Sequence, residues 1–433
     1  MAKINKVGLA LSGGGYRAAI YHIGTFKALK KMNLLDKIDV ISTNSGGSIT
    51  GACYSLNSND FDKFEETLVS GVQKSVVAKI ITHPRFFIPV TLIIGSIVTS
   101  IYLLFTTVAW INIIIWPILI FCILYAQYEL LPISRIIESI YDKLFFKKAT
   151  LKDLSKTVQT TINSTNLSTG RIFHFSAKRM GDSTYDFRDE KDAIYFDHKN
   201  FPVARAVMAS SCVPFAFTPV KIDKIFFYNK NQYSEIKPRL VDGGVYDNQG
   251  IHKLTFYNNA SYCKNVIISD AGNKLAVKEN YRNMLTLLIR TSEVFMARIK
   301  NFQMMNNLYR VPLPTDSNVA YQSLGFDLSN SVKEFMEMLK KGYIATDVIE
   351  GHNIPQTWLI NKNWDAIEEL VSNKVNNLLS QGCSDNELKL ARSVGTNLVP
   401  LSKTEAKALI KHAEISTEIQ LKVFLPHVLN EYT

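Results

Sequence analysis

Short apolar runs alternate with amphipathic segments through the first part of the chain. Val7–Ser12 is apolar at nearly every position, as is typical of a buried strand in a parallel sheet. Ile20, Ile23 and other apolar residues of the next segment recur at helical spacing. A second apolar run, Ile38–Ile41, again leads into a helix-compatible segment, Ile49–Leu56. This alternation of strand and helix predicts an α/β fold with a mostly parallel sheet.

The later pattern is more mixed. A strand–turn–strand unit is predicted where Ser155–Ile162 leads through a polar segment into Arg171–Ser176. We expect a short helix within Phe201–Ser211, a strand ending at Asp242, and a final strand at Val266–Asp270. Beyond it the apolar spacing predicts helices over Asn280–Leu308, Ser331–Tyr343 and Asn363–Leu379.

Phe86–Tyr128 interrupts this pattern with 43 residues that carry no charged side chain. One helix of that length would reach roughly 65 Å, about twice the hydrocarbon core of a bilayer. We therefore predict a transmembrane hairpin over 86–128, with spans near Phe87–Thr107 and Trp110–Tyr128. Lysines and arginines flank both ends, which predicts that both ends lie on the cytoplasmic side. A buried core element is the alternative, although few globular cores need so long an uncharged stretch.

Composition agrees with a membrane protein. Hydrophobic residues make up 47% of the chain, and the net charge of +11 favours an acidic partner. Together with the apolar segment, this charge favours an anionic membrane surface over nucleic acid. The five cysteines show neither metal-ligand spacing nor a disulfide framework, so we expect no metal site and a reducing compartment.

Three consecutive glycines, Gly13, Gly14 and Gly15, join the first strand to the first helix. At a helix start their N–H groups can form a nest for negative charge. One interpretation is a dinucleotide fingerprint, because Gly13-x-Gly15-x-x-Ala18 is followed about twenty residues later by Asp36 or Asp39. The other is an oxyanion hole for acyl transfer. The glycines would also be explained by close packing alone.

Ser45 follows the second strand in the sequence Thr43-Asn44-Ser45-Gly46-Gly47. A serine on a tight strand-to-helix turn presents its hydroxyl at the top of a sheet, where it can act as a nucleophile. Small residues are needed where strand and helix nearly collide. Thr43 stands where the usual Gly-x-Ser-x-Gly pattern has its first glycine, so the turn departs from that pattern.

Asp242 ends a predicted strand and precedes Gly243 and Gly244. The two glycines let the backbone turn away and leave the carboxylate in a cleft, although Asp-Gly pairs also form turns without chemistry. His252 would complete a Ser–Asp–His order, but it lies in a helix-like run and we expect a surface position. A serine and an aspartate can act as a dyad without histidine.

Together these motifs resemble the patatin-like phospholipase family. Gly13–Arg17 resembles its glycine-rich loop, Thr43–Gly47 its nucleophile elbow, and Asp242–Gly244 its Asp-Gly-Gly motif. Ala209–Pro214 and Ile162–Gly170 are similar to two further family elements. The motifs occur in the family's order, with the apolar segment inserted between the elbow and the later ones.

The resemblance implies a three-layer α/β fold and hydrolysis of acyl esters in phospholipids or other lipids, without a cofactor. Ser45 would be the nucleophile, Asp242 its base, and the N–H groups of Gly13, Gly14 and Gly15 the oxyanion hole. With the hairpin, it implies an integral membrane enzyme whose catalytic core faces the cytoplasm. We expect the first portion of the core at 1–80, the transmembrane hairpin at 86–128 and the second portion of the core at 150–272. A helical C-terminal region is expected at 273–433.

Two other functions fit some of the residues. A dinucleotide-dependent enzyme would use the glycine loop and leave Ser45, Asp242 and the apolar segment without a role. A catalytically degenerate membrane scaffold or sensor is suggested by Thr43, whose β-branched side chain lies beneath the predicted nucleophile.

Overall fold

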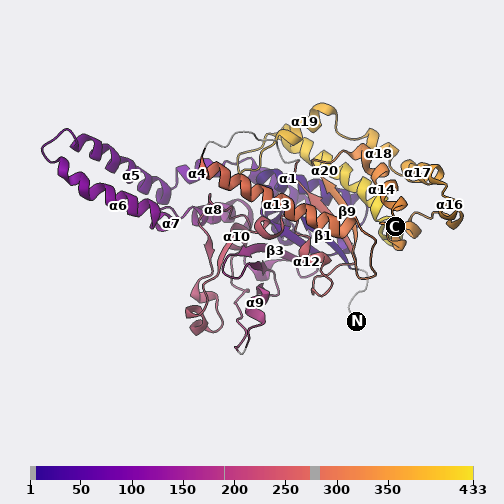
Figure 1. The fold of residues 1–433 in the computed structure, drawn as a ribbon, viewed down its shortest axis with the longest axis horizontal. Helices are drawn as coiled ribbons and strands as arrows, with labels where there is room; N and C mark the ends of the chain where they lie inside the picture. The colour runs from indigo at the N-terminus through magenta and orange to yellow at the C-terminus, as the bar shows by residue number, and fades with distance from the viewer. Residues whose placement is uncertain (1–5, 190, 274–282, 433) are drawn as a thin grey trace.

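One mixed β-sheet organises the chain in a computed structural model that describes residues 6–189, 191–273 and 283–432 (Figure 1). Within these residues the sheet has nine strands. They are β1 Val7–Leu11, β2 Ile38–Asn44, β3 Gln159–Asn166, β4 Arg171–Phe175, β5 Met180–Gly181, β6 Val220–Lys221, β7 Arg239–Asp242, β8 Asn265–Asp270 and β9 Asn318–Ser323.

The sheet is parallel at its centre and antiparallel at one end. Its main order is β5-β4-β3-β2-β1-β8-β9, and the pairs from β3 to β9 are parallel. Strands β4, β5, β6 and β7 form the antiparallel pairs. The prediction that β8 is the final strand was wrong. β9 follows it after a long helix, and its pairing with β8 could not be inferred from local pattern.

Strands β2 and β7 share one edge of β3, and this arrangement positions the site. β2 pairs in parallel with β3 as far as Asn44 opposite Asn163. β7 pairs antiparallel with the next residues, so that Asp242 lies opposite Ser164. The carboxyl ends of β2 and β7 therefore meet head-on, which brings residues about 200 positions apart together.

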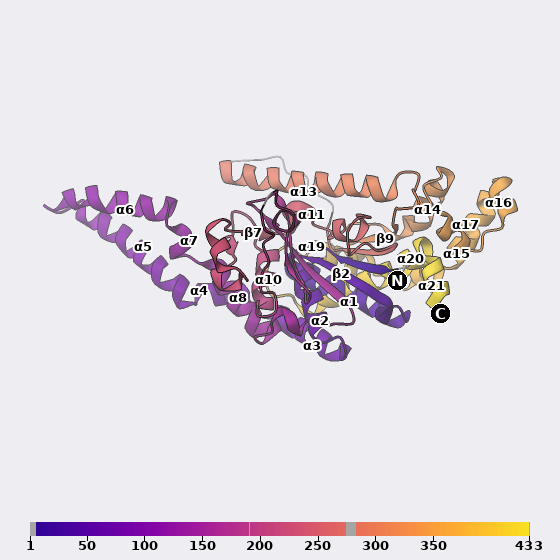
Figure 2. The same ribbon diagram turned by 90° about the horizontal axis from the view of Figure 1, so that it is seen from below.

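Helices cover both faces of the sheet (Figure 2). Leu9 and Leu11 point into the larger core, which is formed with helices that include α1 Gly15–Lys31, α2 Gly46–Leu56, α3 Phe61–Val72, α10 Val203–Ser210 and α20 Lys403–Phe424. Ala10 and Val40 point into a smaller core on the opposite face, with α12 His252–Thr255 and α13 Met284–Leu308. Alternate strand residues thus serve opposite faces, and the molecule has three layers.

The remaining helices are short or lie at the periphery. Those before β9 are α4 Val76–Ile81, α7 Gln127–Leu130, α8 Ile133–Tyr141, α9 Ser183–Asp186 and α11 Gly244–Asp247. Those after it are α14 Ser331–Lys340, α15 Thr346–Gly351, α16 Gln356–Ile360, α17 Trp364–Asn373, α18 Asn376–Ser380, α19 Asp385–Ser393 and α21 Pro426–Tyr432. The C-terminal region is therefore mainly helical, as expected, but contributes β9 and α20 to the core.

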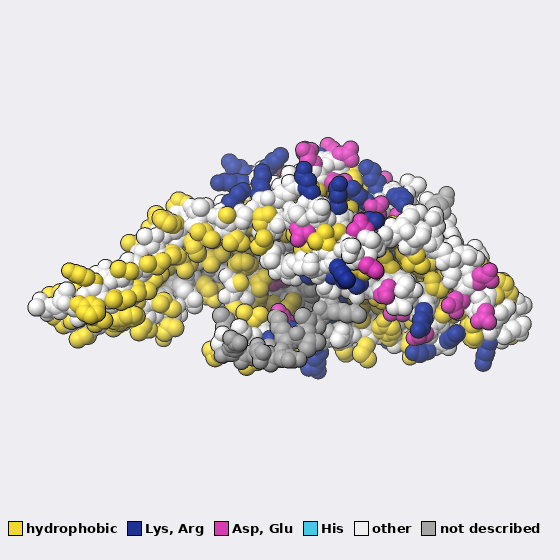
Figure 3. Space-filling view, turned by 90° about the horizontal axis from the view of Figure 1, so that it is seen from above, with side chains coloured by type: hydrophobic (Ala, Val, Ile, Leu, Met, Phe, Trp, Pro, Cys, Tyr) yellow, Lys and Arg dark blue, Asp and Glu magenta, His cyan; other side chains and the backbone are white. Residues whose placement is uncertain are grey.

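The uncharged segment forms a helical hairpin that projects from one end of the molecule (Figure 1). Its helices are α5 Pro84–Leu103 and α6 Asn112–Leu124, joined by a hydrogen bond of 2.6 Å from Ser100 to Asn112. Apolar side chains cover the projecting arm (Figure 3). Among the described residues, α5 alone has the length and apolarity of a membrane span. A second span would have to combine the helical segments 109–124 and Gln127–Phe146, and the chain bends by 79° between these two segments.

Candidate active site

Ser45 lies at the sharp turn between β2 and α2. Its φ of 47° and ψ of −118° are unusual for a residue with a side chain. Such strain at a strand-to-helix turn is typical of a nucleophile elbow. The residue is 7% exposed. The backbone at Ser45 therefore has the geometry that the sequence predicts.

Asp242 is brought to Ser45 by the head-on approach of β7 and β2. The Ser45 side chain lies close enough to its carboxylate to lower the pKa of Asp242, and the Gly244 N–H donates to that carboxylate at 2.7 Å. Burial raises the pKa of Asp242 to about 6, while the Gly244 N–H and the Ser45 side chain act in the opposite direction. A carboxylate with this pKa is ionised at neutral pH and is still basic enough to accept a proton.

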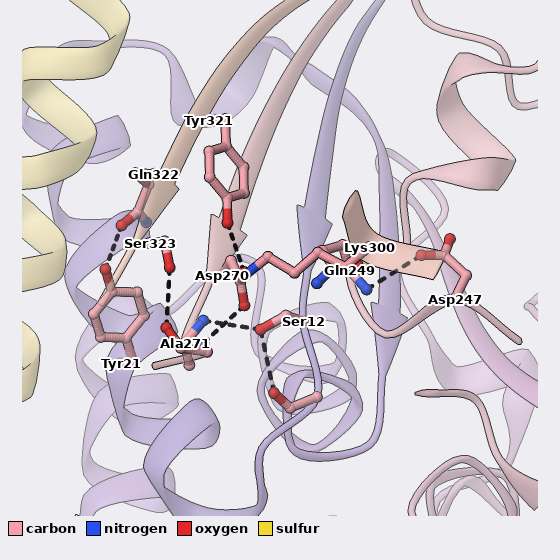
Figure 4. Close-up of polar contacts among 12 residues, drawn as sticks. Ser12, Tyr21, Asp247, Gln249, Asp270, Ala271, Lys300, Tyr321, Gln322 and Ser323 are labelled. Carbon is pink, nitrogen blue, oxygen red and sulfur yellow. Dashed lines mark hydrogen bonds and ion pairs between the residues drawn. The ribbon is translucent and has the colours of Figure 1, made fainter. Parts of the chain in front are cut away.

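The pKa of a second buried aspartate, Asp270, is shifted in the opposite direction. Asp270 accepts from the Lys300 ammonium at 2.6 Å and from the Tyr321 hydroxyl at 2.8 Å (Figure 4). Burial alone would raise the pKa of Asp270, but Lys300, Tyr321 and the Gly272 N–H lower it to about 2. Asp270 is therefore a fixed anion, and Asp242 is the carboxyl of this pair that is suited to proton transfer.

A chain of hydroxyls supports the elbow from behind. The Thr43 hydroxyl donates to the Thr161 carbonyl at 3.1 Å and lies 2.9 Å from the Ser48 hydroxyl. Ser48 lies 2.8 Å from Ser210, which accepts the Ser45 N–H at 2.9 Å. The hydroxyl of Thr43 is thus satisfied in a network that ends on the backbone of Ser45. Sequence reasoning gave Ser210 no such role, since the contact links distant segments.

The methyl group of Thr43 fits because residue 51 is a glycine. A Cβ on Gly51 would lie 2.5 Å from Thr43 Cγ2, far inside van der Waals contact. The β-branched residue beneath the elbow is therefore matched by a missing side chain on α2. This match explains how the fold accommodates the departure from the usual glycine.

Gly51→Ala is accordingly expected to destabilise the protein by about 1–3 kcal/mol, the usual cost of overpacking a core. The cost should largely disappear in a Thr43→Ser background, which removes the methyl group and keeps the hydroxyl. Denaturant unfolding of the two single variants and the double variant measures this coupling. Equal costs of Gly51→Ala in both backgrounds would contradict the proposed contact.

The glycine loop offers fewer free N–H groups than predicted. The N–H of Gly13 donates to the Asn248 carbonyl at 2.9 Å, so it is already used. In the described part of the chain, the N–H groups of Gly14, Gly15 and Gly46 make no backbone or side-chain hydrogen bond. Gly46 directly follows Ser45, a position that often contributes to an oxyanion hole. Sequence reasoning did not single out this residue.

A C-terminal loop packs on the glycine loop. The Asn397 carbonyl accepts the Tyr16 N–H at 2.9 Å, and the Val394 carbonyl accepts from the Arg17 guanidinium at 3.1 Å. Gly15 has a φ of 59°, and a Cβ there would lie 2.4 Å from the Asn397 carbonyl oxygen. Both the backbone angle and the close approach favour glycine. The C-terminal region, to which the sequence assigned no chemistry, thus holds the loop in place.

The structure argues against a dinucleotide site at this loop. Asp39 accepts the N–H of Val7, at the start of β1, whereas the glycine loop follows the end of that strand. The two are separated by the length of β1, roughly 16 Å, so Asp39 cannot serve a ribose bound at the loop. Asp36 precedes the start of β2, which lies at the same far end of the sheet. No cluster of three or more candidate metal ligands occurs among the described residues.

His252 does not join the dyad. Its ring packs beside Tyr246 and Phe256, with centroids 5.6 Å from each. Its backbone N–H donates to the carboxylate of Asp247 at 2.8 Å. Within the described residues no histidine hydrogen-bonds to Ser45 or Asp242. The ring is partly buried rather than at the surface as predicted.

The chain is similar to a known protein family and to several solved structures. A family model described as patatin-like phospholipase matches residues 9–255, more than half of the chain. No curated protein matches the sequence significantly. Similar solved structures include VipD from Legionella pneumophila, at 12% identity and a TM-score of 0.32, covering 100% of this chain and 88% of VipD. Human GIVD cytosolic phospholipase A2 has 10% identity and a TM-score of 0.48, and the match covers 99% of this chain and 63% of the human enzyme.

Proposed function

Because the chain belongs to the patatin-like phospholipase family of serine ester hydrolases, we propose that it is a membrane-anchored lipid acyl hydrolase with a Ser45–Asp242 dyad. The observation that carries the proposal is the close approach of Ser45, on its strained turn, to the buried carboxylate of Asp242, which follows from the pairing of β2 and β7 with the same edge of β3. The family implies a phospholipid substrate.

In the proposed first step, Asp242 accepts the proton of the Ser45 hydroxyl as the oxygen attacks the ester carbonyl. The ester C–O bond then breaks, the lysolipid leaves with the proton held by Asp242, and Ser45 is acylated. A water molecule attacks the acyl-enzyme while Asp242 accepts one of its protons; the bond between the acyl carbon and the Ser45 oxygen then breaks, the fatty acid is released, and Asp242 returns the proton to Ser45. Both steps need only one residue that can gain and lose a proton.

The tetrahedral oxyanion would be held by the N–H groups of Gly14 and Gly15, with Gly46 as a third candidate. These groups are unpaired among the described residues and lie at the N-termini of α1 and α2, where the helix dipoles favour negative charge. Gly13 supports the loop through its hydrogen bond to Asn248.

The hairpin at 86–128 would anchor the enzyme to its substrate membrane. We propose that both ends of the hairpin face the cytoplasm, as the flanking lysines and arginines favour. Residues 1–80 and 150–272 then form a catalytic core on that side, and 273–433 completes it through β9 and α20.

Replacing residues 90–124 by a short Gly-Ser linker tests both the membrane anchor and the lipid hydrolase activity. The shortened chain is expected to move from the membrane pellet to the soluble fraction, because the apolar surface of α5 and α6 is removed. Its hydrolysis of vesicle phospholipid should fall at least tenfold, with hydrolysis of a water-soluble short-chain ester retained. A shortened chain that stays in the carbonate-washed pellet would refute the anchor. A full chain that cleaves neither substrate would refute the hydrolase.

A further inference from the structure

A cavity of about 710 Å³ lies where the hairpin joins the core. The base of α5 forms one wall, the segment around α7 and the start of α8 form the second, and α10 with the strand β6 region closes it. Neither Ser45 nor Asp242 lines it. If the hairpin is embedded, the base of α5 lies at the level of the lipid headgroups.

Two of the arginines that line the cavity have no ion-pair partner among the described residues. Arg205 is paired with Glu138 at 3.1 Å and with Asp223 at 2.6 Å. Lys221 lies 3.9 Å from Glu129. Arg85 and Arg135 line the same cavity and make no ion pair in the described part of the chain, and the positive charge of Arg135 acts to lower the pKa of Glu138, which burial raises. The cavity thus contains two arginines that can bind an anion, and most of its carboxylates already form ion pairs.

Both of these arginines lie in the first turn of a helix. Arg85 is the second residue of α5 and Arg135 the third residue of α8, and neither first turn contains an acidic residue. A helix N-terminus carries partial positive charge, so arginine is unfavourable there unless an anion is near. Here two guanidinium groups line one cavity, and a bound phosphate would offset the charge of both.

The remaining wall is apolar and continues onto the hairpin. Pro84, Ile88, Pro89 and Leu130 line the cavity. Ile88 is 55% exposed, and one turn further along α5 Leu92 is 67% exposed. A ligand that fits both parts has an anionic head and a long apolar tail.

We propose that this cavity binds the headgroup of an anionic phospholipid, with Arg85 and Arg135 contacting the phosphate and an acyl chain lying along α5. A zwitterionic headgroup fits less well, because Glu138 and Asp223 are engaged by Arg205 and leave little for an ammonium group. The site rests on the proposed membrane insertion of the hairpin and is independent of the chemistry at Ser45. It would fix the depth and tilt of the core on the membrane.

Thermal unfolding of the full chain in detergent micelles tests this site, because a ligand that binds only the folded state raises the unfolding temperature. Phosphatidylglycerol is expected to raise it more than phosphatidylcholine at the same mole fraction. In Arg85→Gln/Arg135→Gln the apparent affinity for phosphatidylglycerol should fall at least tenfold. Lys403→Gln/Lys407→Gln removes the same charge from the exposed start of α20 and should retain the preference.

Equal stabilisation of the wild type by the two lipids, or equal loss in the lysine control, would overturn the proposal. Equal stabilisation by inorganic phosphate at the headgroup concentration would assign the site to a soluble anion instead and also overturn it. Should the double glutamine variant not fold, Arg85→Gln and Arg135→Gln are tested singly; each should lower the affinity for phosphatidylglycerol, and an unchanged affinity in both would overturn the proposal. Fluorophosphonate labelling of Ser45 in the same sample shows separately whether the hydrolase proposal holds.

Discussion

Ser45→Ala is expected to abolish labelling by a fluorophosphonate probe and to reduce phospholipid hydrolysis to near the uncatalysed rate. The probe reacts with a serine whose hydroxyl is activated, and Ser45 is the residue whose side chain meets Asp242. Loss of the nucleophile costs a serine protease roughly 10⁶-fold in kcat. The measurement compares labelling and fatty acid release between the variant and the wild type in detergent and in vesicles.

Ser234→Ala is a suitable control, because Ser234 is exposed and, among the described residues, its hydroxyl bonds only to the nearby Asn231 carbonyl. It should label as the wild type does. Labelling that persists in Ser45→Ala would assign the nucleophile to another residue. A folded, membrane-bound wild type that neither labels nor hydrolyses lipid would favour the scaffold or sensor hypothesis that Thr43 suggested.

The local geometry of the site could be predicted because it is encoded by short segments. A strand, three glycines and a helix follow one another within Val7–Lys31, so the position of the loop is set by neighbouring residues, although its role stayed open between several interpretations. The turn at Ser45 is equally local, since the preceding strand and the following helix leave it little room. Patterns within about 25 residues therefore located both the elbow and the loop.

The meeting of Ser45 with Asp242 depends on a pairing that no local pattern contains. It arises because β2 stops at Asn44 and β7 continues along the same edge of β3 from Ser164 onward. The chemistry of the two residues and the family resemblance both suggested a dyad, but neither contained the strand pairing that brings Ser45 to Asp242. β9 escaped prediction for the same reason, because its register is fixed by β8, about 50 residues earlier.

The departures from the family's pattern become intelligible only in three dimensions. Thr43 looked unfavourable beneath the elbow until Gly51 and Ser48 were seen to accommodate its methyl and hydroxyl groups. Likewise, the sequence assigned all three glycines of the loop to the oxyanion, and the Gly13 N–H proved to be bonded to Asn248. Complementary pairs of this kind are set by packing between elements, which a single sequence does not display.

Asp242→Asn is expected to inactivate the enzyme and also to stabilise its fold. Asparagine keeps the shape of the side chain and can still accept the Gly244 N–H, but it cannot take the proton of Ser45. In the wild type, log(kcat/KM) should rise with a slope of one below pH 6 and level off above it, since the base must be ionised. A pH profile that is flat between pH 4.5 and 7.5 in a stable wild type would rule out Asp242 as the base.

The stability difference has a definite direction with pH. The pKa of Asp242 is raised from its usual value of 3.8 to about 6, so the folded state favours the protonated carboxyl. The stability from this preference is fully present below about pH 4 and is lost as the pH rises through 6. The loss is on the order of 3 kcal/mol. The asparagine side chain of the variant carries no charge at any pH and avoids the loss, so the unfolding temperature of Asp242→Asn should exceed that of the wild type at pH 8 and approach it at pH 4. If the unfolding temperatures of the variant and the wild type differ equally at pH 8 and pH 4, the carboxyl of Asp242 is not held in a desolvated site. Burial would then no longer explain why the pKa of Asp242 is raised.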